Sequence, residues 1–365
     1  MIERFDTRCA PPRWARGGHA QTLLGYFLPC PGEALLASEE GVRMRLLDLE
    51  DGDRVAVLDA PPRSAPGFAP GARPLDGVVV HLFHGLTGSS DSNYVRLVGE
   101  VARRAGARVV AFNHRDQGPG EGLARRIYHS GSVADAFASI ARSRTEFPDH
   151  LHLAVGFSLS GNIVLLGAGR DRDHPGAPDA VLAVNPPVDL GRCARRIESG
   201  VNRLYDRNFV KGMRLSLQRR IERGEIDARF TVLRGWSVRQ ADHAVTAPLA
   251  GFSTGDEYYE RCSAGPWLSS IRVPTVVLTS ADDPFIHPSD IEDAARDSSV
   301  FVHVEETGGH LGYIGSNPGP SSRAGTGPAS VAGRRWLGRA TLHYQAELVR
   351  VAALTRRPDA PRGCG

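Results

Sequence analysis

The chain has 365 residues, of which 41% are hydrophobic and 23% charged, a composition typical of a globular protein that argues against wholesale disorder. This length can hold one large α/β domain with insertions or two small domains. The formal net charge is only +3, and the basic residues are scattered arginines with Lys211 as the single lysine, so the sequence predicts no nucleic-acid partner.

The five cysteines form no CxxC pair or other metal-binding spacing, so we expect reduced thiols and no metal site. They are Cys9, Cys30, Cys193, Cys262 and Cys364. The first residues lack the apolar stretch of a signal peptide, and no apolar run reaches membrane-spanning length. We therefore expect a cytoplasmic protein with no stable membrane insertion, and peripheral contact with lipid stays open.

In chain order, residues 1–40 are expected to form an N-terminal arm that packs on the core and is irregular over 11–30, where prolines and glycines mix with apolar residues. Two short alternating runs follow, over 42–50 and 53–60, on either side of Asp51-Gly52. An Asp-Gly pair between such runs is a strong signal for a β-hairpin.

From residue 77 onward, apolar runs alternate with helical patterns. The run 77–83 is continuously apolar, as in a strand that is covered on both faces. Further strands are expected at 107–112, 151–157, 180–185, 274–280 and 299–304, and helices at 93–104, 132–144, 162–169 and 334–354. Because strands that alternate with helices form βαβ units, the pattern predicts an α/β protein with a mostly parallel, doubly wound sheet.

Residues 188–268 interrupt this alternation with arginine-rich helical stretches and no convincing buried strand. They predict a helical cap insertion above the sheet, between core segments 41–187 and 269–354. Residues 316–333 are rich in Ser, Pro, Gly and Ala, which predicts a flexible loop.

The segment 156–161 (Gly-Phe-Ser-Leu-Ser-Gly) joins a strand pattern to a helical run through Ser158. A nucleophile elbow has this form and needs small residues two before and two after the serine, since the sharp turn strains the backbone. Gly156 fits, and Ser160 is a small substitute for the usual glycine. Ser160 could itself be the nucleophile, but its own neighbours at these positions, Ser158 and Asn162, fit less well.

A serine nucleophile needs a base, and the base needs a carboxylate that orients it. In proteins with an elbow of this kind, the three residues occur along the chain in the order serine, acid, histidine. Of the thirteen histidines, His310 lies in a glycine-rich stretch directly after the last predicted strand, where a loop can carry it over the elbow. His343, on the terminal helix, is interpreted as a surface or packing residue. His84 is interpreted as a residue that shapes its own turn.

Two carboxylates, Asp282 and Asp283, follow the strand 274–280 and therefore lie at the carboxyl edge of the sheet. We favour Asp283 as the acid because it stands at the far end of the turn, and interpret Asp282 as a turn-capping residue. The reverse assignment stays open, and Asp189, after the preceding strand, is a more distant alternative.

Acyl transfer to a serine also requires N–H donors for the oxyanion, one from the residue after the nucleophile and one from the loop after an earlier strand. These positions are Leu159 and Leu86, and Gly85 permits the tight backbone at the second. No cofactor is expected, since the glycine-rich stretch 118–122 is not followed by the helix that a dinucleotide fingerprint requires.

Several short motifs, each weak alone, occur together between about residues 10 and 315. They are Pro12-Arg-Trp14, Gly18-His-Ala-Gln-Thr22, His84-Gly-Leu-Thr-Gly-Ser89, Asn113-His-Arg115, Arg126-Ile-Tyr-His-Ser-Gly131, Gly251-Phe252, Glu257-Tyr-Tyr259 and Asp282-Asp-Pro-Phe285. This combination resembles the YheT-like branch of the α/β-hydrolases, which includes yeast medium-chain ethyl ester synthases and membrane-associated lipid hydrolases of animals. The chain departs from the family pattern at Ser160 and in the insertion 316–333.

The resemblance implies an α/β-hydrolase fold and a serine carboxylic ester hydrolase or acyltransferase with its triad on Ser158, Asp283 and His310. Our leading hypothesis is an esterase for short- to medium-chain acyl esters, with a small-molecule ester as its partner. Transfer of the acyl group to an alcohol is the alternative. A non-catalytic binding protein is less favoured because serine, acid and histidine are all present. Apolar residues of the insertion are expected either to form a narrow acyl slot or merely to pack the insertion onto the sheet.

Overall fold

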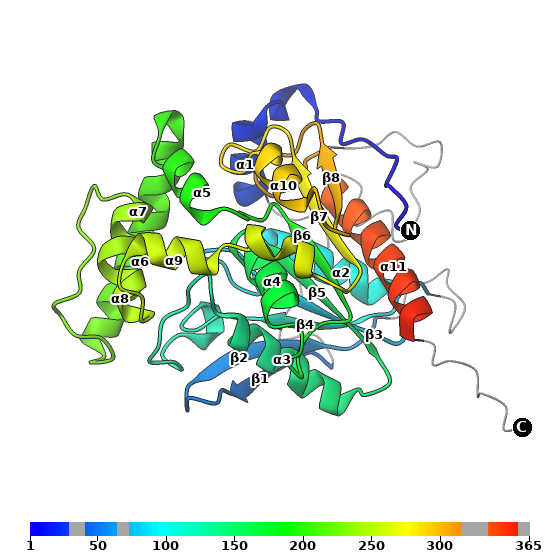
Figure 1. The fold of residues 1–365 in the computed structure, drawn as a ribbon, viewed down its shortest axis with the longest axis horizontal. Coiled ribbons are helices and arrows are strands. Elements are labelled where there is room, and N and C mark those ends of the chain that lie inside the picture. The colour runs from blue at the N-terminus through cyan, green and yellow to red at the C-terminus, as the bar shows by residue number, and fades with distance from the viewer. Residues whose placement is uncertain (29–40, 64–72, 316–334, 357–365) are drawn as a thin grey trace, which may run out of the picture.

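A computed structural model describes residues 1–28, 41–63, 73–315 and 335–356 (Figure 1). Eight strands form one sheet in the order β1-β2-β4-β3-β5-β6-β7-β8. Their bounds are Arg43–Asp48 (β1), Arg54–Ala60 (β2), Val78–Phe83 (β3), Arg108–Phe112 (β4), Leu151–Phe157 (β5), Ala180–Val184 (β6), Thr275–Ser280 (β7) and Phe301–Glu305 (β8). Strands β3 to β8 pair in parallel, whereas β2 pairs antiparallel with β1 and β4. The predicted hairpin and the mostly parallel sheet are confirmed.

The buried strands place successive side chains on opposite faces, so their continuous apolar runs fill two cores. In β3, Val78, Val80 and Leu82 join the core under the helices Asn93–Arg104 (α2) and Trp336–Arg356 (α11). Val79 and Phe83 join the core under the helices Val133–Glu146 (α3) and Leu159–Arg170 (α4). Figure 1 shows these helices on the two faces of the sheet. The sheet is therefore covered on both sides, as a doubly wound fold requires.

The helices expected at 93–104, 132–144, 162–169 and 334–354 begin and end within three residues of the predicted bounds. The helices of the described residues are Gly18–Phe27 (α1), Asn93–Arg104 (α2), Val133–Glu146 (α3), Leu159–Arg170 (α4), Leu190–Ile197 (α5), Arg203–Glu222 (α6), Val238–Ala241 (α7), Ala247–Leu249 (α8), Gly255–Cys262 (α9), Pro288–Ala295 (α10) and Trp336–Arg356 (α11). Across the described residues, no helix combines the length and apolar character needed to cross a membrane.

Between β6 and β7 the chain forms α5 to α9, here called the cap segment, and no strand. The cap segment lies beyond one end of the sheet (Figure 1) and has an apolar cluster of its own that includes Val210, Leu217 and Val238. The 3-10 helix Gly265–Ser270 (η5) packs instead against α4. The approach is close, since a Cβ on Gly169 of α4 would lie 2.4 Å from the backbone oxygen of Trp267. The end of the predicted insertion 188–268 therefore packs on the core.

The N-terminal residues are more regular than their composition suggests. Residues 18–27 form the helix α1, so the expectation of an irregular segment over 11–30 is wrong there. Gly18 and Gly25 let α1 approach other backbone closely, since a Cβ at either position would collide with Asp282 or Gly312. The predicted flexible loop 316–333 lies outside the described residues.

Candidate active site

Ser158 stands at the turn between β5 and α4, with φ of +52° and ψ of −120°. A non-glycine residue in this region is strained, and the turn persists only where its surroundings enforce it. A Cβ on Gly156 would lie 2.3 Å from the backbone oxygen of Ser160, and one on Gly161 would lie 3.0 Å from Pro186. The close approaches thus occur at Gly156 and Gly161, which explains why residue 160 can carry a side chain.

The three residues chosen from the sequence as serine, base and acid lie in hydrogen-bonding contact. The Ser158 hydroxyl is 2.8 Å from Nε2 of His310, and Nδ1 of His310 is 2.8 Å from Oδ2 of Asp283. The serine is partly exposed, whereas the Asp283 side chain is fully buried. This is the geometry that a serine nucleophile, a histidine base and an orienting carboxylate require.

The two neighbouring aspartates bind different parts of the site. Asp283 also accepts hydrogen bonds from the Asn185 side chain at 2.7 Å and from the backbone N–H groups of Phe285 and Ile286. Asp282 accepts from the N–H groups of Gly308 and Gly309, both at 2.8 Å, and so holds the loop that carries His310. The more distant alternative, Asp189, caps α5 by accepting from the N–H of Arg192.

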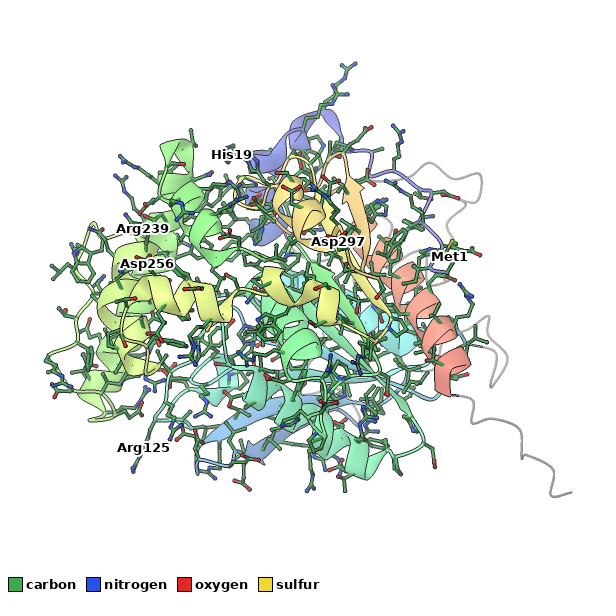
Figure 2. The ribbon with its side chains drawn as sticks, viewed as in Figure 1. Met1, His19, Arg125, Arg239, Asp256 and Asp297 are labelled. Atoms are coloured by element: carbon green, nitrogen blue, oxygen red, sulfur yellow. The ribbon has the colours of Figure 1, made fainter. Side chains whose placement is uncertain are left out.

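The loop of His310 rests on α1. The His310 N–H donates to the Thr22 hydroxyl at 2.9 Å, and the Gln21 side chain bonds both backbone groups of Ile314. Gly309 has φ of +54°, and a Cβ there would lie 2.3 Å from the backbone oxygen of Gly18. Helix α1 is therefore part of the support of the site. Figure 2 shows His19 on the same helix, where it stacks on Tyr205 of α6.

The two expected N–H donors lie beside the serine. Leu159 is the first residue of α4, where helical N–H groups lack intrahelical partners. Leu86 follows Gly85, at which a Cβ would lie 3.1 Å from the Cβ of Ser158. Both Leu86 and Leu159 line the same cavity as Ser158 and His310.

This cavity has a volume of about 470 Å³ and extends between the elbow and the cap segment. Its lining is largely apolar and includes Leu190, Ala194, Val245, Leu249 and Ile286. Pockets of this size bury most of a drug-sized ligand.

One wall of the cavity carries a buried carboxyl, Asp242, in the π-helical turn Asp242–Thr246 (η4). Burial raises its pKa to about 6, against the lowering effect of hydrogen bonds from Thr246 and Tyr259. The hydroxyl of Tyr259 donates to this carboxyl at 2.9 Å, so the contact ties α9 to the π-helical turn.

Some residues that support the site were not predicted from the sequence. Asn185 directly follows β6 in a left-handed conformation, with φ of +49°, and links Asp283 to the hydroxyl of Tyr313. The only sequence feature that could have indicated this role of Asn185 is its position as a polar residue at the carboxyl end of a buried strand. Ser160, the alternative nucleophile, is fully buried and hydrogen-bonded to His84 and His114, so its hydroxyl does not face the cavity.

The interpretation of His84 fits its contacts, because its Nδ1 donates to the carbonyl of Gly85 at 2.7 Å in the same turn. His343 contacts Phe5 and bonds the backbone of Glu3, far from the cavity. Among the described residues, no group of three or more His, Cys, Asp and Glu side chains could hold a metal ion.

Comparison with known proteins agrees with this fold. Residues 78–316 match a family described as the alpha/beta hydrolase fold. The chain belongs to the α/β-hydrolase fold family. Within it, the expected likeness to the YheT-like branch is confirmed: the chain is 32% identical over 239 residues to "Putative esterase YheT" of Escherichia coli (strain K12), covering 64% of this chain and 70% of that protein.

A second relative is "Phospholipase ABHD3" of Homo sapiens, 25% identical over 317 residues, which span 83% of this chain and 73% of that protein. Among solved structures, the Pyrococcus furiosus esterase Pf2001 is similar with a TM-score of 0.50 and 15% sequence identity, over 84% of this chain and 91% of that one. This structural likeness supports the fold alone.

Proposed function

We propose that the chain is a serine hydrolase of carboxylic acyl esters, with Ser158 as nucleophile, His310 as base and Asp283 as the orienting acid. The observation that carries the proposal is the continuous contact from the Ser158 hydroxyl through His310 to Asp283, at 2.8 Å for each bond. The names of the relatives, an esterase and a phospholipase, support an enzyme that cleaves esters.

In this mechanism His310 takes the proton of Ser158 as the serine oxygen attacks the ester carbonyl carbon, and the carbonyl oxygen becomes an oxyanion. The N–H groups of Leu86 and Leu159 stabilise this charge. The imidazolium, steadied by Asp283, then gives its proton to the departing alkoxide, which leaves an acyl group on Ser158. A water molecule attacks the acyl carbon by the same route, releases the carboxylic acid and restores the serine.

The test of the nucleophile is Ser158→Ala. We expect turnover of a nitrophenyl ester to fall by about a thousandfold or more, since one member of the triad is removed. A fluorophosphonate probe should label the wild type at Ser158 and fail to label the variant. Ser298→Ala is the control, because this serine follows α10, does not line the cavity, and its hydroxyl bonds the backbone of Ala295 and Val300. An unlabelled wild type, or a Ser158→Ala variant with normal turnover, would contradict the proposal.

For the substrate we propose short- to medium-chain acyl esters, because the lining of the cavity is largely apolar and part of it comes from the cap segment. Each buried methylene contributes up to about 0.8 kcal/mol, so kcat/KM should rise with acyl length and stop rising when the cavity is full. Nitrophenyl esters from acetyl to palmitoyl measure this dependence. A steady rise to palmitoyl would disprove the chain-length proposal and leave the nucleophile untouched.

A further inference from the structure

The backbone that carries the Leu86 N–H is held by side chains from two other elements, α4 and α2. Both contacts are made by the peptide unit between His84 and Gly85. Its carbonyl accepts a hydrogen bond from the hydroxyl of Ser160, in the first turn of α4. Its N–H donates to the hydroxyl of Tyr94, on α2, at 3.0 Å. Both ends of this peptide are therefore fixed.

The next peptide unit, between Gly85 and Leu86, is held through its carbonyl. The oxygen of Gly85 accepts from Nδ1 of His84 at 2.7 Å and from the N–H of Gly88 at 3.0 Å. Because a trans peptide is planar, with its N–H opposite its C=O, these contacts also set the direction of the Leu86 N–H. Within the described residues, that N–H donates to no other group.

The protonation of this network follows from its partners. The N–H of His114 donates to Nε2 of His84 at 3.1 Å, so the His84 proton is on Nδ1. The single hydroxyl proton of Ser160 goes to the His84 carbonyl, so Nε2 of His114, 2.7 Å from the Ser160 oxygen, must be the donor there. Burial lowers the pKa of His84 to about 4 and that of His114 well below its usual value, so both rings stay neutral near neutral pH.

We propose that Ser160 is a positioning residue, which aligns the Leu86 N–H with the oxyanion by holding the His84 carbonyl and the His114 ring in one hydrogen-bonded chain. The inference rests on the proposed function of Ser158. It also gives a reason for serine where the family pattern has glycine. A glycine at 160 would leave the His84 carbonyl and the His114 Nε2–H buried without these partners, and buried polar groups without partners destabilise a fold.

The first variant is Ser160→Ala, which removes the hydroxyl and little volume. Loss of an oxyanion donor lowers kcat by about 10²–10³, and a donor that is only misaligned should cost less, about tenfold. We expect kcat to fall by that factor while KM stays within about twofold, since the contact matters in the transition state. A trifluoromethyl ketone, which forms an oxyanion adduct with serine, should bind about tenfold more weakly.

The second variant is Tyr94→Phe, which keeps the ring that packs on Phe157 and removes the acceptor at the other end of the same peptide. It should lower kcat and weaken trifluoromethyl ketone binding in the same direction as Ser160→Ala. Ser298→Ala is the control for loss of a serine with two backbone partners elsewhere.

The outcomes separate this inference from the proposed function. If the wild type neither hydrolyses esters nor reacts with a fluorophosphonate at Ser158, the proposed function fails and the inference with it. If the wild type is active and Ser160→Ala keeps its kcat per titrated site and its trifluoromethyl ketone affinity, the positioning role is wrong and the function stands. A lower melting temperature with both quantities unchanged would assign Ser160 a structural role only and overturn the inference.

Discussion

At the residue scale, adjacent aspartates take on different tasks because the chain turns sharply between them. Asp283 points to the ring of His310, and Asp282 points to the backbone of the loop that carries this ring. Only a group that contacts the imidazole can select its tautomer and steady the imidazolium. The contacts therefore favour Asp283 as the acid.

Asp283→Asn should lower kcat by a factor on the order of 10⁴, because an amide nitrogen can face Nδ1 of His310 and reverse its tautomer. Asp282→Asn keeps an oxygen that can accept from Gly308 and Gly309, so we expect a loss below about tenfold. Steady-state kinetics of the two variants make the comparison. The reverse ranking would move the acid to Asp282.

At the element scale, α1 supports the histidine loop although it lies outside the sheet. The side chain of Gln21 is fully buried and bonds the carbonyl of Ala15 at 2.7 Å as well as both backbone groups of Ile314. The contacts between Gln21 and Ile314 join residues 293 positions apart in the chain. The position of His310 therefore depends on the N-terminal helix.

Gln21→Leu should lower the free energy of unfolding by about 2–3 kcal/mol, since it leaves buried backbone groups without partners. The variant should also lose activity, because Ile314 follows the His310 loop. Urea denaturation measures the first effect and ester hydrolysis the second. Gln218→Leu is the control: Gln218 is exposed and bonds only Glu222 at 3.0 Å, so its loss should change stability by less than about 0.5 kcal/mol. Equal effects of the two variants would show that α1 does not support the loop in this way.

At the scale of the whole molecule, the core holds several histidines in neutral form. Burial lowers the pKa of His84 and His129 to about 4, and that of His81 and His114 well below the usual value. In the unfolded chain these residues titrate near 6.5, so the unfolded state binds more protons as the pH falls from about 6.5 toward 4. The contribution of these neutral histidines to the free energy of unfolding is therefore complete above pH 6.5. It is lost as the pH falls from 6.5 toward 4. Burial also raises the pKa of three carboxyls, Asp135, Asp206 and Asp242, the last to about 6. They work in the opposite direction but are outnumbered by the four histidines.

We therefore expect the free energy of unfolding to decrease between pH 6.5 and 4. His129→Asn should flatten this dependence by up to about 1.4 kcal/mol per pH unit, the share of one proton. An asparagine oxygen can replace Nδ1 of His129, which accepts from the N–H of Gly131 at 3.1 Å. The control is His287→Asn, which removes an exposed histidine. Urea denaturation across this range is the measurement, and an unchanged slope in His129→Asn would refute the explanation.

The features that depend on local sequence pattern could be predicted from the residues alone. Continuous apolar runs predicted the buried strands of a doubly wound sheet, because a strand covered on both faces has no polar side to show. Small residues around Ser158 predicted the elbow, since the tight turn between strand and helix excludes larger ones. The glycine-rich context after the last strand singled out His310 among thirteen histidines.

Which side chains come into contact depends on how distant segments pack in the folded chain. The contact between His310 and Ser158 spans 152 positions in the chain, and that between Ser160 and His84 spans 76. Whether Asp282 or Asp283 faces the imidazole depends on how the turn after β7 is oriented against Asn185 and the loop of His310. The composition of residues 18–27 likewise did not indicate the helix α1. Its contacts with Ile314 and Gly312 are visible only in the folded structure. These choices are made by contacts between distant segments, and a pattern read over neighbouring residues does not contain them.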